Sequence, residues 1–386
     1  MQTMKKTIFA SAALPFLANA SGLLLQEAVY ANAGTAGAGD GVHTKSATAI
    51  FTNPATMSFM GESALSINTL LLDMELSYSD DNQRGDGSAD TMLPVVGAFY
   101  TKAITEKLHG GINFSITSGS GVNYGSDWAG SHALKSVFLS AAQVNPAVSY
   151  RINESLSMAG GLQFGYALLN VETQALELSD IATDTAWGYN LGLMFQQERW
   201  AAGLSFRSAV DFEFDSELEG KLGAGIVNTV IATSIFTPNI VDISTSYQLN
   251  EKFSLLGSIQ WHNWSEMDAT PVLLNSNVVY IERDWEDVWR YTVGTEYQLN
   301  SSWRLKAGFS YETSPQDDPT KQWVDLPVGE TYRYSMGASY QFSDITVDTF
   351  YEYTDFGSIE IDRQGTRPIQ GTFNGRVHFI GANFLF

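Results

Sequence analysis

The chain has 386 residues, no cysteine, and a formal net charge of −21, with 21 Lys and Arg against 42 Asp and Glu. The absence of cysteine excludes disulfides and thiolate metal sites, and the acidic balance argues against nucleic-acid binding, which needs a basic face. Aromatic residues make up 12 % of the chain, which also has 34 glycines and no long apolar run after residue 20. This composition fits a membrane β-barrel and not a transmembrane helix bundle.

Residues 1–20 have the pattern of a cleaved export signal. Lys5 and Lys6 precede a short apolar stretch, and Ala18-Asn19-Ala20 forms a small-x-small cleavage site. The stretch is too short to span a bilayer, which disfavours the alternative of an N-terminal membrane anchor. We therefore expect a mature chain that begins at Ser21. Loss of the two signal lysines would take its formal charge from −21 to −23.

Residues 21–61 are rich in Ala and Gly and lack the alternation of a strand. A floppy periplasmic tail is one interpretation, but the segment carries too many large apolar residues for a solvated tail. These residues are Leu23, Leu24, Leu25, Val29, Tyr30, Ile50 and Phe51. We expect the segment to fill the lumen of a barrel formed by residues 62–386, since a wide barrel cannot be filled by its own side chains.

Residues 62–386 alternate apolar and polar positions over runs of ten or more residues, for example in 289–299, 303–312 and 332–342. A period of two indicates strands, and this length suits a tilted membrane crossing. Short polar turns alternate with longer loops, as in outer-membrane barrels. The turns are 105–107, 152–154, 197–199, 249–251, 299–301 and 342–344, and the loops lie near 80–91, 119–137, 176–184, 214–237, 266–285, 314–330 and 356–372. These connections predict an all-β transmembrane antiparallel barrel of about 14 strands, which is an even number as single-chain barrels require.

The final ten residues alternate as well, and the chain ends in Phe386. A terminal strand that ends in an aromatic residue is typical of bacterial outer-membrane barrels. We therefore expect a multi-pass protein of the bacterial outer membrane. Along the strands, the aromatic face should contact lipid, with Tyr291, Val293, Tyr297, Leu305, Phe309 and Tyr334 outside. The charged face should line the lumen, with Arg207, Arg290, Arg304, Lys306, Arg333, Glu296, Glu312, Asp348 and Glu352 inside.

Three stretches of residues 21–61 resemble the mature N-terminus of the FadL/TodX family of outer-membrane transporters for long-chain fatty acids and aromatic hydrocarbons. They are Ser21 to Glu27, Ala33 to Gly39, and Ala47 to Ala55, which includes the motif Asn53-Pro54-Ala55 where that family's hatch carries it. The resemblance continues through Thr237-Pro238 to Trp264, Tyr291 to Pro315, and Leu326-Pro327 to Phe342, and so spans nearly the whole mature chain. One turn, Val328 to Arg333, departs from the family's acidic, Arg-ending pattern, so no ligand contact of that turn is carried over.

The resemblance implies passive uptake of a hydrophobic ligand, with capture at the outer loops, a lumen pocket, and release when the hatch shifts. In the family, release is thought to be sideways, beside a kinked third strand. Here the third strand runs into Ser118-Gly119-Ser120-Gly121, and glycines permit bends and bulges. Gly119 and Gly121 therefore join Asn53, Pro54 and Ala55 as candidate gating residues. The alternative is that these glycines merely begin the second outer loop.

Loop 214–237 is the candidate capture surface, because it is unusually apolar for an exterior loop. Its apolar residues recur every three to five positions, which suggests a helix with a broad apolar face. The ligand candidates in this loop are Leu222, Ile226, Val230, Ile231 and Phe236. The segment 128–139 could form a groove with it. Packing of one loop on another, without any ligand, explains the same pattern.

Arg207, Lys306 and Arg333 are the lumen candidates for binding a ligand carboxylate, since a buried anion needs a cationic partner. Pairing with the lumen acids is the competing role for each of them. Catalysis is not expected, because the five histidines have no nucleophile beside them and no Gly-x-Ser-x-Gly elbow is present. We expect no cofactor and no metal site. Weak divalent-cation binding at Asp80-Asp81 or Asp317-Asp318 stays open, although solvated loops explain these pairs as well.

The sequence therefore predicts an outer-membrane channel for long-chain fatty acids or hydrocarbons, most simply a monomer. Its partners would be the hydrophobic ligand (or a detergent in its place) and the lipid and lipopolysaccharide of the outer membrane, with no nucleic acid. A general porin or a surface adhesin that uses the same barrel is the alternative. A plugged lumen separates these alternatives, since a general porin needs an open polar lumen.

Overall fold

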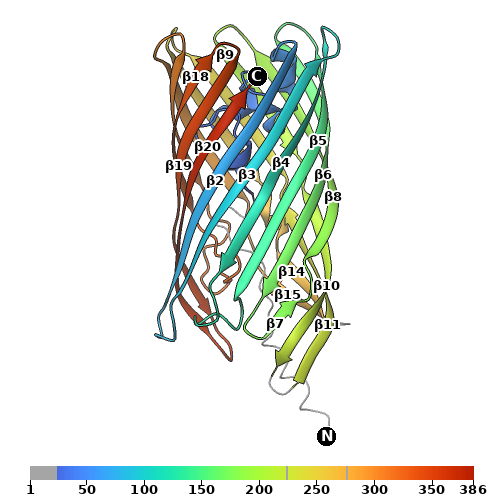
Figure 1. Cartoon of the computed structure of the whole chain (residues 1–386), viewed down its shortest axis with the longest axis vertical. Coiled ribbons are helices and arrows are strands. Elements are labelled where there is room, and N and C mark those ends of the chain that lie inside the picture. Colours follow the sequence, from blue (N-terminus) through green and yellow to red (C-terminus); the bar gives the residue numbers. More distant parts are fainter. Residues whose placement is uncertain (1–23, 223–224, 275–276) are drawn as a thin grey trace.

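The computed structural model describes residues 24–222, 225–274 and 277–386, and it is a closed antiparallel barrel of 14 strands (Figure 1). Neighbouring strands pair in sequence order, and the last strand pairs with the first to close the ring. The barrel strands are β2 Ser63–Asp80, β3 Gly87–Ala103, β4 Leu108–Asn123, β5 Ser136–Arg151, β6 Leu156–Glu172, β8 Ala182–Gln196, β9 Trp200–Arg207, β12 Ile240–Gln248, β13 Phe253–His262, β16 Val288–Gln298, β17 Trp303–Glu312, β18 Thr331–Phe342, β19 Ile345–Arg363 and β20 Ile369–Leu385. The predicted fold class and strand number are confirmed.

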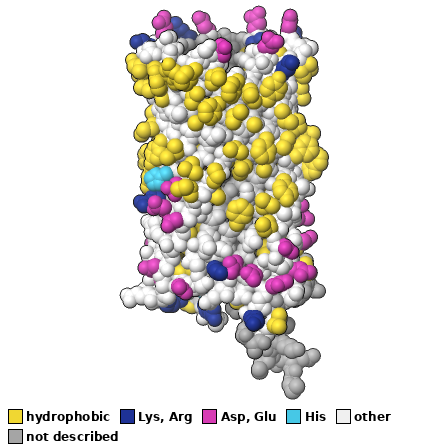
Figure 2. Space-filling view, viewed as in Figure 1, with side chains coloured by type: hydrophobic (Ala, Val, Ile, Leu, Met, Phe, Trp, Pro, Cys, Tyr) yellow, Lys and Arg dark blue, Asp and Glu magenta, His cyan; other side chains and the backbone are white. Residues whose placement is uncertain are grey.

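The two faces of each strand meet different surroundings, as the period of two requires. Val293 and Tyr334 are exposed on the outer face, whereas Lys306 and Arg333 are buried in the lumen. On the face shown in Figure 2, apolar side chains form a broad band across the barrel, and most charged side chains lie toward its two ends. Lumen charges and lipid-facing aromatics therefore lie on the faces that the alternation predicts.

All six predicted short turns lie between barrel strands, at the end of the barrel where the C-terminus lies (Figure 1). At the other end, several strands extend further than the sequence predicts. The expected loops near 80–91 and 356–372 shrink to residues 81–86 and 364–368, because β2, β3, β19 and β20 continue into them. At these strand ends the outward side chains are polar, because they lie beyond the apolar belt. The sequence therefore lacks there the apolar–polar alternation that predicts a strand.

Five further strands pair with one another and extend the same sheet beyond the barrel rim at the long-loop end, where they are called the outer sheet (Figure 1). They are β7 Leu176–Leu178, β10 Val210–Leu222, β11 Gly225–Thr237, β14 Ala269–Leu274 and β15 Asn277–Glu282, and a short helix, η5 Trp264–Glu266, precedes β14. The helix predicted in 214–237 is therefore wrong, since this stretch forms the β10–β11 hairpin. Along this hairpin Ile231 and Ile235 are buried, whereas Ile226 and Val230 are exposed.

Residues 24–60, here called the inner segment, lie inside the barrel toward the end that holds the C-terminus (Figure 1). The segment contains four short helices, η2 Gln26–Val29, η3 Asp40–Val42, α1 Ala49–Thr52 and η4 Pro54–Phe59. No helix among the described residues is long and apolar enough to cross a membrane. Residues 1–20, the predicted export signal, lie outside the described residues, as does Leu23.

Candidate ligand-binding site in the barrel lumen

Wall glycines allow the inner segment to lie directly against the strands. A Cβ atom at Gly308 of β17 would overlap the carbonyl oxygen of Thr35. At Gly337 of β18 a Cβ would come within 2.9 Å of Cα of Gly34, and at Gly294 of β16 within 2.9 Å of Cβ of Ala38. Only glycine permits such close backbone approach. These three adjacent strands therefore form a seat for the Gly34–Ala38 turn, and larger residues would push it away.

The motif Asn53-Pro54-Ala55 is fixed on the opposite wall. The Asn53 side chain accepts a hydrogen bond from the Ala55 N–H (3.0 Å) and donates to the carbonyl oxygens of Gly41 (2.8 Å) and Leu193 (3.0 Å). Pro54 starts η4, where its missing N–H costs nothing. The Ala55 carbonyl accepts from the Ser157 hydroxyl at 2.8 Å. This motif thus ties the inner segment to β6 and β8, and its role in gating remains a prediction.

Two of the three predicted carboxylate-binding cations already have carboxylate partners. Arg333 donates to Glu27 of the inner segment and to Glu312 of β17, at 3.0 Å in both cases. Lys306 pairs with Asp348 at 2.7 Å. Both cations are almost fully buried, so a ligand anion would have to displace an existing buried partner. Arg333 and Lys306 are therefore placed to stabilise the lumen and the inner segment.

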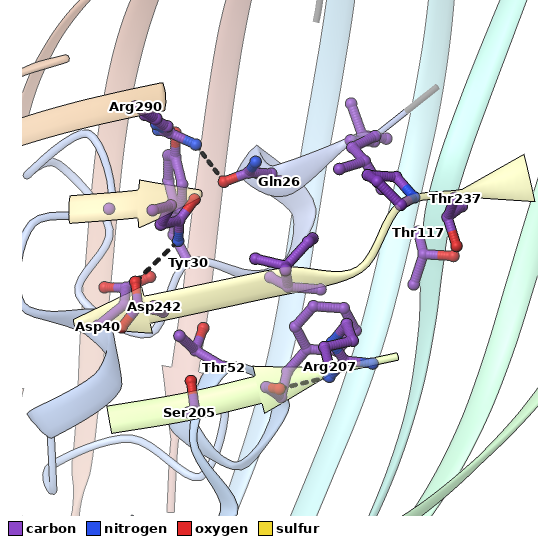
Figure 3. A pocket seen from close by; sticks show the side chains of 18 of the residues that line it. Gln26, Tyr30, Asp40, Thr52, Thr117, Ser205, Arg207, Thr237, Asp242 and Arg290 are labelled. Carbon is purple, nitrogen blue, oxygen red and sulfur yellow. Dashed lines mark hydrogen bonds between the residues drawn. The ribbon is translucent and has the colours of Figure 1, made fainter. Parts of the chain in front are cut away.

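A cavity lies between the inner segment and the barrel wall, and residues from both line it (Figure 3). Its volume is about 70 Å³, so the cavity is small and narrow. Its apolar lining comprises Leu24, Leu25, Val29, Phe51, Pro238 and Ile240. Its polar lining includes Arg207, Arg290, Gln143, Gln163, Gln260, Asp40 and Asp242. This mixture suits a slender molecule with a long apolar part and a polar end.

Arg207, the third predicted cation, lines this cavity and has only neutral partners among the described residues. Its guanidinium donates to the Phe51 carbonyl oxygen and to the side-chain oxygens of Gln163 and Gln143, the last at 3.4 Å. It also stacks on the Phe51 ring, with 3.8 Å from Cζ to the ring centre. A half-buried guanidinium without a carboxylate partner favours an anion.

Arg290 is a second cavity arginine, and the sequence identified it only as lumen-facing. It donates to the Tyr30 hydroxyl (2.6 Å), the Ala36 carbonyl (2.9 Å), the Ser310 hydroxyl (2.8 Å) and the Gln26 side chain (Figure 3). No pattern in the sequence distinguishes it from the other lumen cations, because its partners come from a distant segment. Its hydrogen bonds to the inner segment and to β17 occupy four of its five N–H donors.

Asp40 shows how the inner segment satisfies its own buried charge. Burial raises the pKa of Asp40 to about 6, and the hydrogen bonds from the N–H groups of Asn32 and Ala31, at 3.0 Å each, oppose this rise. The carboxylate thereby closes the turn that leads to the glycine seat. Asp40 thus stabilises the fold of the inner segment, and each of its carboxylate oxygens already accepts a backbone hydrogen bond.

The third barrel strand, β4, is interrupted at Thr117. Its ladder with β5 shifts by one residue between Ile116 and Ser118, so Thr117 is an extra, bulged residue. Its ladder with β3 runs from His109 to Ser115 and does not continue through residues 116–123 of β4. The freed Thr117 carbonyl accepts a hydrogen bond from the Leu25 N–H at 2.9 Å. Both residues line the cavity, which therefore adjoins the interrupted ladder.

The bulge lies just before the predicted kink residues Gly119 and Gly121. The Thr91 hydroxyl of β3 donates to the Gly121 carbonyl, across the part of the wall where the ladder is missing. Gly119 has open space around its α-carbon. The irregularity is therefore real, and it falls on Thr117, one residue ahead of the Ser118–Gly121 run. The gating role of the glycines stays a prediction.

The predicted capture residues do not line the cavity but lie on the outer sheet. Ile226 is 83 % exposed and Val230 53 % exposed, whereas Ile231 is 3 % exposed and belongs to the buried core. Phe236 packs on Trp264, with 5.8 Å between ring centres. The side chain of Leu222 lies outside the described residues. Ile226 and Val230 thus present apolar surface to the exterior, and Ile231 and Phe236 pack inward.

Segment 128–139, the proposed partner of loop 214–237, packs on aromatic residues near the barrel strands β2 and β20. Trp128 lies against Tyr78 and Tyr124, with ring centres 5.2 and 4.7 Å away, and near Phe373. This aromatic cluster fixes the second outer loop on β2 and β20. Within the described parts of the chain, no group of three or more His, Asp or Glu side chains could hold a metal ion.

The chain matches the family model described as outer membrane protein transport protein (OMPP1/FadL/TodX) over residues 11–386. Outer membrane protein P1 of Haemophilus influenzae is 25 % identical over 87 % of this chain and 86 % of that protein. The long-chain fatty acid transport protein of Salmonella typhi is 21 % identical over 99 % of each chain.

Solved structures agree on the fold. A Pseudomonas aeruginosa FadL homologue superposes with a TM-score of 0.85 at 15 % identity, over 95 % of this chain and 99 % of that chain. The Pseudomonas putida toluene transporter TodX superposes with a TM-score of 0.75 at 16 % identity, over 92 % and 98 % of the two chains. At such low identity these superpositions establish the barrel and not the ligand.

Proposed function

Because the chain belongs to the OMPP1/FadL/TodX family of outer-membrane transport proteins, which are transporters and not enzymes, we propose that it imports long-chain hydrophobic molecules without an energy source of its own. Two of the four related chains named above are a long-chain fatty acid transport protein and a toluene transporter. The observation that carries the proposal is the narrow lumen cavity, which combines an apolar lining with an arginine whose hydrogen-bond partners among the described residues are all neutral.

Within the cavity, the ligand's apolar part would lie along Leu24, Leu25, Val29 and Phe51. Burial of apolar surface supplies the affinity, at about 25 cal/mol per Å². Arg207 would bind a carboxylate at the polar end, since its neutral partners leave its charge uncompensated. Lys306 and Arg333 are less suited to this role because their carboxylate partners are already in place. A long-chain fatty acid satisfies both parts of the cavity, whereas a hydrocarbon satisfies only one.

Residues 21–61 would act as a hatch, and the interrupted β3–β4 ladder would be the exit. The support is the hydrogen bond from Leu25 to Thr117, which joins the hatch to the bulge where wall pairing stops. A shift of Leu25 would free this part of the wall. The ligand could then leave sideways into the membrane without crossing water, which an apolar chain avoids.

Capture would begin at the outer sheet, where Ile226 and Val230 are exposed. Outer-membrane lipid and lipopolysaccharide would surround the apolar belt, and a single chain suffices for the route described. The general-porin alternative is disfavoured by the inner segment, which contacts the wall at several glycines and leaves little lumen space. For the adhesin alternative, no feature of the outer sheet points to a particular partner.

Uptake of a labelled long-chain fatty acid by cells that lack their own transporter tests the proposal. Cells that express this chain should accumulate the label in a saturable manner, well above cells with an empty vector. Entry of a small polar dye should stay unchanged, because the lumen is filled. Fast dye entry without fatty-acid uptake, at a verified surface level, would refute the transporter and support the porin.

A further inference from the structure

We propose that the lipid-facing wall of the barrel binds one phospholipid, with an acyl chain in a trough that crosses strands β2, β3, β18, β19 and β20. The phospholipid belongs to the leaflet at the short-turn end and carries an ammonium headgroup, as phosphatidylethanolamine does. It stays at this fixed place, whereas ordinary boundary lipids exchange freely. The site lies on the outer surface and is therefore separate from any ligand in the lumen.

The floor of the trough is a row of two alanines and two threonines that ends at a valine. Strand pairing places one residue of each strand side by side, and alternation puts all five on the outer face. In the order β3, β2, β20, β19, β18 they are Val96, Thr69, Ala382, Thr349 and Ala338. Four strand spacings of about 4.8 Å give the row a length of roughly 19 Å.

Larger side chains stand on both sides of this row. The next outward positions toward the long loops are Pro94, Leu71, Ile380, Tyr351 and Met336. Toward the short turns, the larger outward side chains are Ile67, Phe384, Val347 and Tyr340. The recess beside the first set has a volume of about 770 Å³, and a second recess near Trp303 has about 430 Å³. Ala338 and Thr349 line both, so the two recesses are continuous.

The floor is apolar in spite of its two threonines. The Thr69 hydroxyl donates to the Ala382 carbonyl at 2.9 Å, and the Thr349 hydroxyl donates to the Ala338 carbonyl at 3.4 Å. With its hydroxyl bonded to a neighbouring strand, each threonine offers mainly its methyl group to the membrane side. An occupant of the trough therefore finds no free polar group on the floor and has to be apolar itself.

The direction of the trough suits an acyl chain of one leaflet. Ala338 lies nearer the end of β18 at Phe342 than Val96 lies to the end of β3 at Ala103, so the row slopes toward the short-turn rim at β18. One leaflet contributes about 15 Å of hydrocarbon, half of the bilayer core. A tilted chain along the row would cross most of that thickness. The strands β2, β3 and β20 face the viewer in Figure 2, and the apolar band continues across them.

A second copy of the barrel fits the trough poorly. Two convex walls touch along a line that is parallel to the barrel axes. The trough runs obliquely around the wall from β3 to β18, so a facing barrel reaches only a short part of it. An unbranched, flexible chain can follow the curvature and fill the whole length, which buries apolar surface on both walls.

Aromatic residues mark the end of the trough at the short turns. The ring centres of Trp303 and Tyr340 are 4.6 Å apart, and those of Tyr340 and Phe342 are 4.4 Å apart. Trp and Tyr at this level of a membrane protein contact the polar part of lipids. Among the described residues, the Trp303 indole N–H and the Tyr340 hydroxyl have no hydrogen-bond partner. Both can therefore donate to the ester or phosphate oxygens of the phospholipid.

Charge at this rim favours an ammonium headgroup. The β18–β19 turn consists of Ser343 and Asp344, and the β16–β17 turn, residues 299–302, has no charged side chain. These two turns flank the aromatic end and supply one acid and no base. Asp344 would attract an ammonium group and would repel the carboxylate of a free fatty acid. This favours phosphatidylethanolamine over phosphatidylglycerol and over a fatty acid.

Native mass spectrometry of the full chain in a mild detergent detects the bound lipid directly. The wild type should keep one phosphatidylethanolamine per chain through an exchange into fresh detergent. When phosphatidylethanolamine and phosphatidylglycerol with the same palmitoyl and oleoyl chains are added in equal amounts, the first should be the adduct that persists. Loss of all lipid at this step, or equal retention of the two lipids, would overturn the proposed site or its headgroup preference respectively.

Ala382→Leu tests the position, because Ala382 is the middle of the floor. The larger side chain overfills the trough, and retention should fall about tenfold. The barrel should still assemble, since the side chain faces lipid, and heat-modifiable gel mobility verifies this. Ala202→Leu is the matched control. Ala202 lies on the lipid face of β9, opposite Phe195 and Thr245, and lines neither recess. It should keep the lipid as the wild type does.

A phosphatidylethanolamine with a diazirine in its acyl chain locates the site independently of any variant. Light should attach it to peptides of β18, β19 and β20 in the wild type and in Ala202→Leu, and much less in Ala382→Leu. Labelling spread evenly around the barrel, or equal labelling of the three proteins, would show boundary lipid only and overturn the site. Displacement of the label by palmitate and not by unlabelled phosphatidylethanolamine would overturn the choice of a phospholipid.

Discussion

Individual glycines decide how closely the inner segment approaches the wall. The sequence shows 34 glycines, but nothing in it tells which of them face another backbone. Gly308 and Gly337 alternate with large residues like any strand position, and their partners lie about 300 residues away in the chain. Their importance follows only from the folded structure, whereas Asn53-Pro54-Ala55 could be noticed from the sequence as a tight turn.

Replacement of Gly308 by alanine should displace the inner segment. The new Cβ would overlap the Thr35 carbonyl, and a backbone atom cannot turn away as a flexible side chain can. Overpacking of this kind costs about 1–3 kcal/mol, and displacement of the segment relieves it. We expect Gly308→Ala to show a higher conductance in planar bilayers than the wild type, with an intact barrel by heat-modifiable gel mobility.

Gly257→Ala is the matched control for this change. A Cβ there would meet its neighbours at 3.7 Å or more, which is ordinary contact. Its conductance should equal that of the wild type. If Gly308→Ala also conducts like the wild type, the glycine seat does not hold the segment in place.

The strands of the barrel wall could be predicted from the sequence more reliably than those of the outer sheet. Strands such as β16 and β17 carry large outward aromatics and could be recognised from alternation alone. In β10 the outward face is acidic and in β11 it is mixed, so the hairpin looked like an apolar loop with helical spacing. The third strand was recognised as irregular from its glycines, but the bulge falls on Thr117, because pairing with β5 and not composition sets the register.

Deletion of Thr117 should regularise β4. Without the extra residue, Ile116 and Ser118 would face consecutive partners on β5, and the β3–β4 ladder could extend. If ligand leaves through this part of the wall, uptake of labelled fatty acid should fall at least about tenfold while binding to the purified protein persists. Uptake at the wild-type rate, with equal surface level, would exclude this exit and favour release into the periplasm.

Replacement of Ile226 and Val230 together by serine tests the outer sheet. Both side chains are exposed, so the barrel should assemble normally. Burial of each against a ligand is worth about 1.5–3 kcal/mol, and the double variant should therefore raise the fatty-acid concentration needed for half-maximal uptake. Ile231 is left unchanged because it is buried. Its replacement would reduce uptake through misfolding as well as through loss of capture. An unchanged concentration dependence would leave packing as the role of this surface.

At the scale of the whole molecule, the barrel follows from short-range information. Alternation, turn spacing and the terminal Phe386 indicated the compartment, the strand number and the lumen-facing charges, because each depends on neighbours a few residues away. The cavity does not follow from short-range information. It forms where four distant segments meet, which contribute Leu25, Phe51, Arg207 and Arg290. Arg207 was one of three equivalent candidates in the sequence. The structure separates it from the other two, because Arg207 lines the cavity and Lys306 and Arg333 are held in ion pairs.

The central claim is that the lumen cavity holds a long-chain amphiphile, and mass spectrometry of molecules that co-purify with the protein tests it most directly. Protein extracted from membranes in a mild detergent, then stripped with organic solvent, should release long-chain fatty acids well above a general porin treated alike. Arg207→Gln should lower the recovered acids while its barrel stays folded. If the wild type yields no more fatty acid or hydrocarbon than the porin, the cavity does not serve as the binding site described here.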